Sequence, residues 1–227
     1  MNKKVIVALD NNNIKKTIKI ANIVKNEVHS FKIGYEFFFN FGINGYKDLQ
    51  KVCPNIFLDL KLHDIPNTVK HGIDAILKLK PILTTIHISG GDDMMKASKL
   101  NKSKTKILGV SVLTSLDDRM VKKYYNENNI SIIVKKYVKE AKQNKLDGVV
   151  CSPKEIKLVR KEVGKKFLII TPGIRFSENI IENDDQERTM TPKEAIKLGA
   201  DLIVIGRPIT QSKDPLKVIK NINKSIL

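Results

Sequence analysis

Residues 59–64, which read Asp-Leu-Lys-Leu-His-Asp, bring acids and a base together at a spacing that suits chemistry. The apolar run Ile56–Lys61 predicts a strand, and residues two apart in a strand face the same way. Asp59 and Lys61 therefore share a face with Phe57, while the leucines at 58, 60 and 62 share the other. A structural ion pair is the alternative, but desolvation offsets much of the attraction between buried charges. We interpret the pair as functional.

Two other predicted strands also end in charge. An apolar run at residues 5–9 leads into Asp10, and Lys32 lies in the short strand Phe31–Ile33. Lys32 alone could be an exposed lysine, but a shared rim would place it among Asp10, Asp59 and Lys61, with Asp64 just beyond. Alternating acids and bases at close range favour the charged form of each. We therefore expect Lys61 to stay protonated at neutral pH and to be suited to donate a proton.

Two turns that combine glycine and arginine follow the last two predicted strands, at Thr171–Arg175 and Gly206–Thr210. Glycine lets the backbone approach an anion closely, and the arginine guanidinium offers a planar fork for phosphate oxygens. Barrel enzymes commonly bind phosphate at the ends of strands seven and eight. Either turn alone is a weak signal, but both together, in a chain with only five arginines, predict a phosphate-binding site.

Short apolar runs that predict strands alternate with amphipathic stretches that predict helices. The predicted strands are Lys4–Leu9, Phe31–Ile33, Ile56–Lys61, Leu83–Ile88, Lys106–Leu113, Gly148–Cys151, Phe167–Ile170 and Leu202–Ile205. Predicted helices include Ile65–Leu79 and Pro192–Leu198. Residues 152–155 and 191–194 share a helix-start signature, a Ser or Thr cap followed by Pro and then Glu.

Eight such strands, each followed by a helical pattern, predict an α/β fold, the (β/α)8 or TIM barrel with eight parallel strands. We expect residues 1–227 to form a single barrel domain. An open doubly wound sheet is the alternative. The polar stretch from Thr171 to Thr191 lacks periodicity, and a loop of that length in a compact domain is typical of a lid or binding loop.

The composition, 41% hydrophobic and 29% charged, is typical of a globular protein. No apolar run approaches the roughly 20 residues of a membrane span, and no secretory signal is evident at the N-terminus. Cys53 and Cys151 are isolated, which favours a reducing compartment and buried structural roles. We therefore expect a cytoplasmic protein that does not bind membranes.

The net charge of +17 raises the question of whether the protein binds nucleic acid. Only five of the 41 basic residues are arginine, and aromatic residues make up 6% of the chain. The lysines are spread along the chain beside many Asn and Ile residues. The codons of Lys, Asn and Ile are AT-rich, so base composition could produce this pattern without a partner. A nucleic-acid binder usually concentrates its charge and adds arginine and aromatics. We predict a solvated lysine surface with no nucleic-acid partner, although the basic field would help to attract an anionic substrate.

The four histidines form no spaced metal set, and no P-loop, dinucleotide fingerprint or Ser-His-Asp arrangement can be placed. We interpret His63 and His87 as structural polar residues near the rim, and we predict no metal site.

Several of these segments, in chain order, resemble the orotidine 5′-phosphate decarboxylase family. Residues 57–68, Phe-Leu-Asp-Leu-Lys-Leu-His-Asp-Ile-Pro-Asn-Thr, resemble its signature strand. The other segments that are similar to the family are Val7–Asp10, Phe31–Gly34, Ser111–Ser115, Thr171–Arg175, Asp184–Pro192 and Gly206–Thr210. The compact length is similar to the bacterial form. The Asp-x-Lys-x-x-Asp spacing is shared with metal-using sugar-phosphate relatives, but Lys32, residues 63–68 and Gln186 favour the orotidine enzyme.

The resemblance implies a carboxy-lyase that decarboxylates orotidine 5′-phosphate to UMP, the last step of de novo pyrimidine synthesis, without metal or organic cofactor. It implies a charged catalytic network of Lys32, Asp59 and Lys61, completed by Asp64 from the second subunit of a homodimer with shared active sites. In this scheme Lys61 protonates C6 of a carbanion-like intermediate as carbon dioxide leaves.

The resemblance also implies the substrate contacts. The ribose hydroxyls would be held by Asp10 and Lys32, with Thr68 reaching across from the partner subunit. The remaining residues would bind base and phosphate: Thr114 and Pro172 at the pyrimidine, Gly206 and Arg207 at the phosphate, Gln186 between the two, and Arg175 as support in the closing loop.

Three other interpretations stay open at this stage. The nearest is a metal-dependent sugar-phosphate decarboxylase or aldolase on the same barrel. The second is a basic nucleic-acid-binding module with an enzyme-like shape. The third is a pseudoenzyme, although every motif residue that catalysis would require is present.

Overall fold

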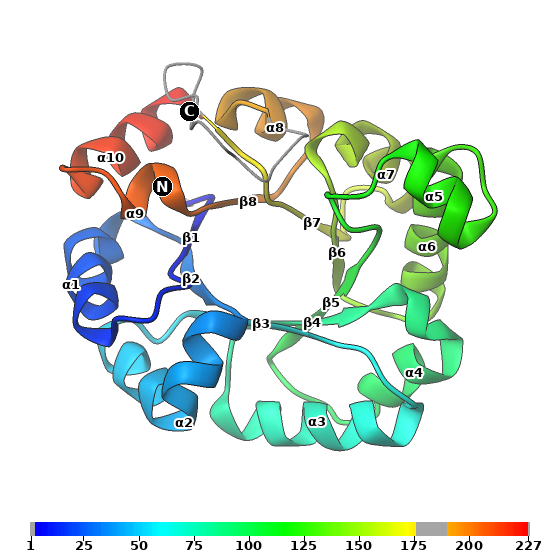
Figure 1. Cartoon of the computed structure of the whole chain (residues 1–227), viewed down its shortest axis with the longest axis horizontal. Helices are drawn as coiled ribbons and strands as arrows, with labels where there is room; N and C mark the ends of the chain where they lie inside the picture. Colours follow the sequence, from blue (N-terminus) through cyan, green and yellow to red (C-terminus); the bar gives the residue numbers. More distant parts are fainter. Residues whose placement is uncertain (1–2, 176–189, 227) are drawn as a thin grey trace.

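Eight parallel strands close into one ring in the computed structural model, which describes residues 3–175 and 190–226 (Figure 1). The strands are β1 Val5–Ala8, β2 Ser30–Ile33, β3 Ile56–Leu62, β4 Leu83–His87, β5 Lys106–Val110, β6 Gly148–Val150, β7 Leu168–Thr171 and β8 Leu202–Ile205. Each strand pairs with its neighbours in the sequence, and β1 pairs with β8 through Val5 and Ile203. The predicted TIM barrel is confirmed, and the alternative of an open sheet was wrong.

The helices lie outside the ring of strands (Figure 1). They are α1 Ile14–Val24, α2 Tyr35–Val52, α3 Pro66–Leu79, α4 Gly91–Ser98, α5 Asp118–Tyr125, α6 Ile130–Gln143, α7 Ile156–Val163, α8 Pro192–Leu198, α9 Arg207–Thr210 and α10 Pro215–Ser225. The predicted start of α8 is confirmed: the Glu194 N–H donates to the Thr191 hydroxyl, and the Thr191 N–H donates to the Glu194 carboxylate. At the second predicted start, the Ser152 N–H donates to the Glu155 carboxylate in the same way.

The barrel interior is filled by one apolar cluster contributed by six strands. Its members are Ile6, Phe57, Leu83, Leu108, Ile170, Leu202 and Val204. Side chains from six strands can meet only inside the ring, so Phe57 points inward. Leu58, Leu60 and Leu62 pack with the outer core under the helices. The predicted facing of this strand is therefore confirmed, and Asp59 follows Phe57 on the inner face.

Most observed strand ends lie within one residue of the predicted ones, and two of the differences bear on the site. β5 ends at Val110 rather than at Leu113. The Ser111 N–H still donates to the main-chain oxygen of Val150 on β6, but the chain then turns, and the Leu116 N–H donates to the Leu113 oxygen. β3 continues one residue further, to Leu62, through an irregular pairing with β4. That irregularity lies at Lys61, whose φ of 45° is in the left-handed region.

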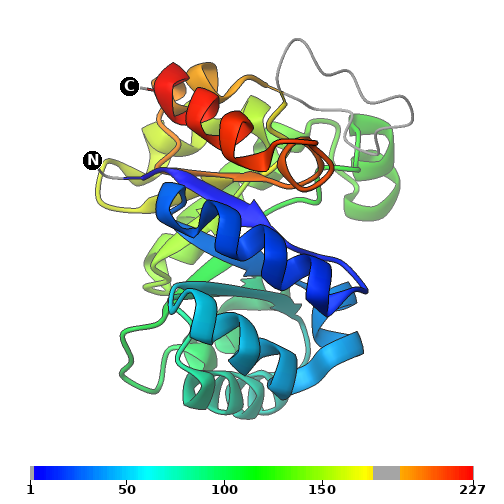
Figure 2. The same cartoon turned by 90° about the vertical axis from the view of Figure 1, so that its left-hand side faces the viewer.

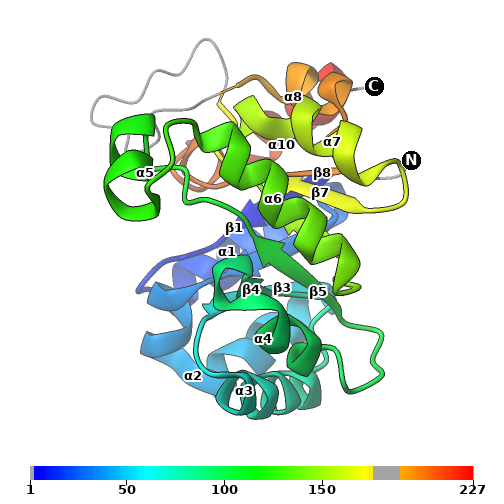
Figure 3. The ribbon, with the colours of Figure 1, turned by 90° about the vertical axis from the view of Figure 1, so that its right-hand side faces the viewer.

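The carboxyl ends of the strands meet at one end of the barrel, to which β1 points in Figure 2. Helix α5 lies at this same end in the view from the opposite side (Figure 3). The strand-end residues Asp10, Lys61 and Gly206 share this mouth, where barrel enzymes hold their active sites. Within the described part of the chain, none of the helices combines the length and the apolar character needed to cross a membrane.

Candidate active site

Four charged side chains form a continuous chain of alternating sign at the mouth of the barrel. The Lys32 ammonium, on β2, lies 2.7 Å from the Asp10 carboxylate and 3.4 Å from the Asp59 carboxylate. The Lys61 ammonium lies 2.7 Å from the same Asp59 oxygen, Oδ2. The shared rim expected for these residues is confirmed, because β1, β2 and β3 are adjacent strands of the ring.

Asp59 is buried at the centre of this chain, with 6% of its surface exposed. Burial alone would raise its pKa. The charges of Lys32 and Lys61, with hydrogen bonds from Lys61 and Thr85, outweigh that effect and hold the pKa below its usual value. Burial likewise opposes the charge of Lys32, but Asp59 and Asp10 raise its pKa. At neutral pH the site therefore holds fixed charges of both signs.

The backbone of Lys61 adopts a conformation that a lysine seldom takes. Its φ is 45°, and the register of β3 against β4 shifts between Leu58 and Leu62, as in a β-bulge. The Lys61 ammonium also lies 5.9 Å from the centre of the Tyr35 ring, at the start of α2. Such non-glycine outliers cluster at functional sites because the surrounding structure must hold them.

Gly34, between β2 and α2, allows a close approach to Asp10. Its N–H donates to Asp10 Oδ1 at 2.5 Å, and a Cβ at this position would lie 3.0 Å from both carboxylate oxygens. Asp10 thus accepts a backbone hydrogen bond through one oxygen and pairs with Lys32 through the other. Because Gly34 has no side chain, its N–H can approach Asp10 closely, and this hydrogen bond helps to orient the carboxylate.

A cavity of about 460 Å³ opens beside this chain and reaches the two predicted phosphate turns. Its lining is Ala8, Asp10, Lys32, Glu36, Pro172, Gly173, Arg175, Val204, Gly206, Arg207 and Thr210. Gly173 has a φ of 75°, which a side chain would strain, and Gly206 precedes the four-residue helix α9. The structure therefore brings both glycine–arginine turns to one cavity, next to Lys32.

Three predicted site residues, Asp64, Thr68 and Thr114, do not line this cavity. Asp64 and Thr68 are exposed, and Asp64 accepts a hydrogen bond from the N–H of Ile65. No ion pair within the described residues joins Asp64 to the charged chain. Thr114 is partly exposed in the turn after β5. A fourth predicted residue, Gln186, lies outside the described residues, as does most of the segment 184–192 that resembles the family's phosphate lid.

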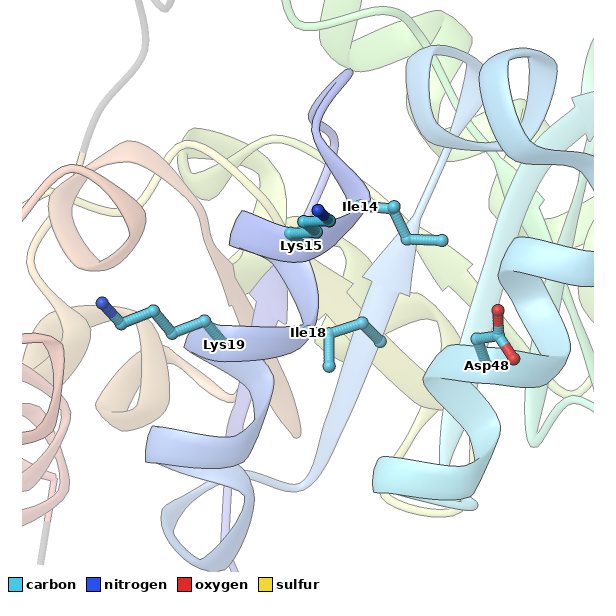
Figure 4. A pocket seen from close by; sticks show the side chains of 5 residues that line it. All are labelled: Ile14, Lys15, Ile18, Lys19 and Asp48. Atoms are coloured by element: carbon cyan, nitrogen blue, oxygen red, sulfur yellow. The ribbon is translucent and has the colours of Figure 1, made fainter.

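Two further cavities do not gather catalytic groups. One, of about 490 Å³, lies between α1 and α2 and is lined by Ile14, Lys15, Ile18, Lys19 and Asp48 (Figure 4). In this view both isoleucines point toward α2, and Asp48 is already paired with Lys51 at 2.8 Å. The other, of about 320 Å³, lies where the strands begin, with His29, Asn55 and Lys106 among its lining. This is the end of a barrel that serves stability rather than catalysis.

His63 and His87 lie together beside the mouth, with ring centres 5.1 Å apart. Burial and, to a lesser extent, the nearby His63 and Lys61 together lower the pKa of His87 to about 4, because they outweigh the opposing effect of Asp59. No three His, Cys, Asp or Glu side chains of the described residues are grouped as a metal ion would require. Cys53 and Cys151 are free thiols in the core, which confirms the prediction that both are buried.

Three residues at the site were not predicted: Thr85, Tyr35 and Glu36. Thr85 lies on the inward face of β4, and a polar residue facing into a barrel was a signal that could have found it. Tyr35 and Glu36 open α2, directly after the strand that carries Lys32, so proximity to that strand end was the only indication. Thr210, which also lines the cavity, ends the predicted turn that contains Arg207.

Comparisons with known proteins agree with this geometry. A profile described as the orotidine 5′-phosphate decarboxylase / HUMPS family matches residues 3–222. The orotidine 5′-phosphate decarboxylase of Wolbachia pipientis subsp. Culex pipiens is 45% identical over 224 residues, which cover 98% of each chain. That of Dictyoglomus thermophilum is 41% identical over 232 residues, which cover 98% of this chain and 94% of the relative. The crystal structure of orotidine 5′-phosphate decarboxylase from Lactobacillus acidophilus superposes with a TM-score of 0.84, at 38% identity and over 99% of both chains.

Proposed function

Because the chain belongs to the orotidine 5′-phosphate decarboxylase / HUMPS family, we propose that it is the carboxy-lyase that converts orotidine 5′-phosphate to UMP in pyrimidine synthesis. The observation that supports this most directly is the chain of alternating charges from Asp10 through Lys32 and Asp59 to Lys61, next to a cavity that carries Arg207. Such a site offers fixed positive charge at one end and an anion-binding turn at the other.

The chemistry requires a cation close to the reacting carbon. When the bond from C6 to the carboxylate breaks, the electron pair stays on C6 in an sp² orbital that the ring π-system cannot accept directly. A fixed ammonium beside C6 stabilises that charge, and it then donates its proton to form the new C6–H bond. Lys61 is the residue proposed for this role, and the step yields UMP, carbon dioxide and the neutral Lys61 amine.

Asp59 and Lys32 support Lys61 in this scheme. Asp59 holds the Lys61 ammonium at 2.7 Å, and its depressed pKa keeps the carboxylate charged throughout the neutral range. Lys32 lies between Asp59 and Asp10, where its positive charge limits the repulsion between the two acids. We propose that Asp10 and Lys32 also hold the ribose hydroxyls, since both line the cavity.

The phosphate and the base would occupy the side of the cavity formed by the last two strand ends. Gly206 precedes a short helix after β8 and Arg207 opens it, which is a common phosphate-binding arrangement in barrels. Arg175 lines the same cavity and would support the phosphate, and Pro172 would lie against the pyrimidine. Thr114 is a further proposed contact of the base, and Gln186 is proposed to bridge the base and the phosphate. Binding energy from the remote phosphate is useful where it organises the charges for reaction.

We propose that the protein works as a homodimer whose sites are shared. Asp64 and Thr68 follow the catalytic strand but are exposed, and they would complete the site of the partner subunit. Large apolar side chains are also exposed nearby: Phe39 at 78%, Ile65 at 67% and Tyr35 at 50%, with the Tyr35 and Phe39 rings stacked at 5.7 Å. Exposed apolar groups of this size are typical of an interaction surface. The two buried free thiols favour the reducing cytoplasm as the compartment.

The test is a spectrophotometric assay of orotidine 5′-phosphate turnover, with and without EDTA. Decarboxylation that is unchanged by EDTA supports the proposal of a reaction without metal. Loss of activity in EDTA, restored by a divalent cation, would support a metal-dependent sugar-phosphate enzyme on this barrel instead. Absence of turnover, together with tight and salt-sensitive binding to DNA that UMP does not compete, would support a nucleic-acid-binding role.

A further inference from the structure

Thr85 lies opposite the irregularity that carries Lys61. Leu58 on β3 pairs with Thr84 on β4, and the next pair is Leu62 with Ile86. Between these two pairs the chain advances four residues along β3 but only two along β4. Thr85 is the single β4 residue in that interval. Its main chain cannot pair in register with the longer β3 segment, so another group must satisfy the polar atoms of the bulge.

The Thr85 hydroxyl satisfies two of these atoms at once. It accepts a hydrogen bond from the main-chain N–H of Lys61 at 2.9 Å and donates one to Asp59 Oδ1 at 2.8 Å. An N–H can only donate and an ionised carboxylate can only accept, so both roles of the hydroxyl are fixed. Thr85 has no exposed surface, and water cannot easily take its place.

These two bonds act on the two residues proposed to carry the reaction. With Oδ1 of Asp59 held by Thr85, only Oδ2 faces the lysines, at 2.7 Å from Lys61 and 3.4 Å from Lys32. The second bond holds the Lys61 backbone in its left-handed conformation, which determines where the side chain begins. We propose that Thr85 is a positioning residue that aims both the Lys61 ammonium and the Asp59 carboxylate, an inference that rests on the proposed function.

The neighbouring residue Thr84 provides a contrast within the same strand. It is equally buried, but its hydroxyl donates to the main-chain oxygen of Leu58 at 2.9 Å, and no hydrogen bond within the described residues joins it to a charged side chain. If Thr85 were only a buried threonine with a satisfied hydroxyl, loss of either hydroxyl would have the same kind of effect, a lower stability. The positioning role instead predicts an effect on catalysis that is confined to Thr85.

The experiment compares three variants of the full-length protein: Thr85→Val, Thr85→Ser and Thr84→Val. Valine keeps the shape of threonine and removes the hydroxyl, and serine keeps the hydroxyl. For Thr85→Val we expect kcat to fall by about 10- to 100-fold, the scale of a reacting group displaced by a fraction of an ångström to an ångström. KM and the affinity for UMP should stay within about threefold, since phosphate and ribose contacts are untouched. Thr85→Ser and Thr84→Val should keep kcat within about threefold of the wild type.

Thermal unfolding of all three variants separates catalysis from stability. The inference is overturned if Thr85→Val keeps wild-type kcat, if Thr84→Val loses as much kcat as Thr85→Val, or if Thr85→Ser fails to restore kcat while folding normally. Each of these results leaves the proposed reaction intact, because the wild type still turns over orotidine 5′-phosphate. Failure of the wild type itself to decarboxylate that substrate would remove the proposed function, and Thr85 would then be judged only by UMP affinity and stability.

Discussion

Asp59 meets both lysines of the site through a single carboxylate oxygen, Oδ2, while Thr85 occupies the other. A carboxylate held in this way cannot rotate without losing a hydrogen bond in a buried setting, where an unsatisfied polar group is costly. The charges at the mouth are therefore preorganised before any substrate arrives. Preorganised charge is the form of electrostatic stabilisation that contributes most to enzyme rates.

Lys61→Ala tests the proton donor. We expect kcat to fall by about four orders of magnitude or more, because the variant loses both the cation beside C6 and the proton. UMP affinity should remain within about threefold, since the phosphate contacts stay in place. The measurement is turnover of orotidine 5′-phosphate alongside UMP titration. The exposed Lys15, on α1, provides a matched control, and near-normal decarboxylation by Lys61→Ala would refute the assignment.

Arg207→Ala tests the phosphate site. We expect kcat/KM for orotidine 5′-phosphate to fall by about 100-fold, the scale of a lost charge-assisted contact to phosphate. The same change should have little effect on orotidine, which lacks the phosphate. Arg119, whose side chain is 85% exposed, serves as the control position. Equal penalties for both substrates would show that Arg207 does not bind phosphate.

His87 predicts a dependence of stability on pH. Its pKa is lowered to about 4 in the folded protein, against about 6.5 in the unfolded chain, mainly by burial. The unfolded state therefore binds a proton first, so the stability from neutral His87 is complete above pH 6.5 and is lost as pH falls toward 4. We expect the thermal midpoint to decrease over this interval, and to decrease less in His87→Gln. Identical pH profiles for the two proteins would contradict the prediction.

At the scale of the elements, the junction between β2 and α2 is as constrained as the catalytic strand. Gly34→Ala would place a Cβ 3.0 Å from both oxygens of the Asp10 carboxylate, which must then move. Because Asp10 lines the substrate cavity and pairs with Lys32, we expect kcat/KM to fall by about tenfold. The thermal midpoint, measured in parallel, should change little. An unaltered kcat/KM would show that the orientation of Asp10 is unimportant.

Sequence patterns predicted all eight strands, because each is a short apolar run bounded by polar residues, and the inward face of Asp59 and Lys61 followed from the alternation of β3. The irregularity at Lys61 could not be predicted. Lysine has no preference for φ of 45°, and the shift exists only because β4 is shorter than β3 across the interval from Leu58 to Leu62. Thr85 was missed for the same reason: its role depends on the register between two strands.

The two glycine–arginine turns were predictable as a site for a different reason. Strand order alone determines that the ends of β7 and β8 lie side by side, so two turns 35 residues apart reach one cavity. The signals at Tyr35 and Glu36 were weaker, because both residues lie on an exposed helix start, where nearly any residue is tolerated. Sequence patterns thus found the residues whose place depends on topology and missed those whose place depends on side-chain packing.

At the scale of the whole molecule, shared sites can be tested by mixing two inactive variants. Lys61→Ala and Asp64→Asn should each be nearly inactive, but a mixed dimer would contain one site with both residues intact. With random exchange about half of the dimers are mixed, so the mixture should recover about a quarter of wild-type activity. Mixing two samples of Lys61→Ala is the control. No recovery after subunit exchange would argue against a partner contribution from Asp64.

The pairing of β1 with β8 joins the first strand to the last, with Val5 beside Ile203 and Val7 beside Ile205. During synthesis on the ribosome, the edge of β1 that pairs with β8 therefore stays unpaired until nearly the whole polypeptide has been made. An unpaired strand edge in a nascent chain is a template for association with other chains. Asp10 and Arg207, which share the cavity, come together only when this seam closes. Synthesis that stops before residue 202 would leave a chain that holds most of the charged residues of the site and no enclosed ring to hold them in place.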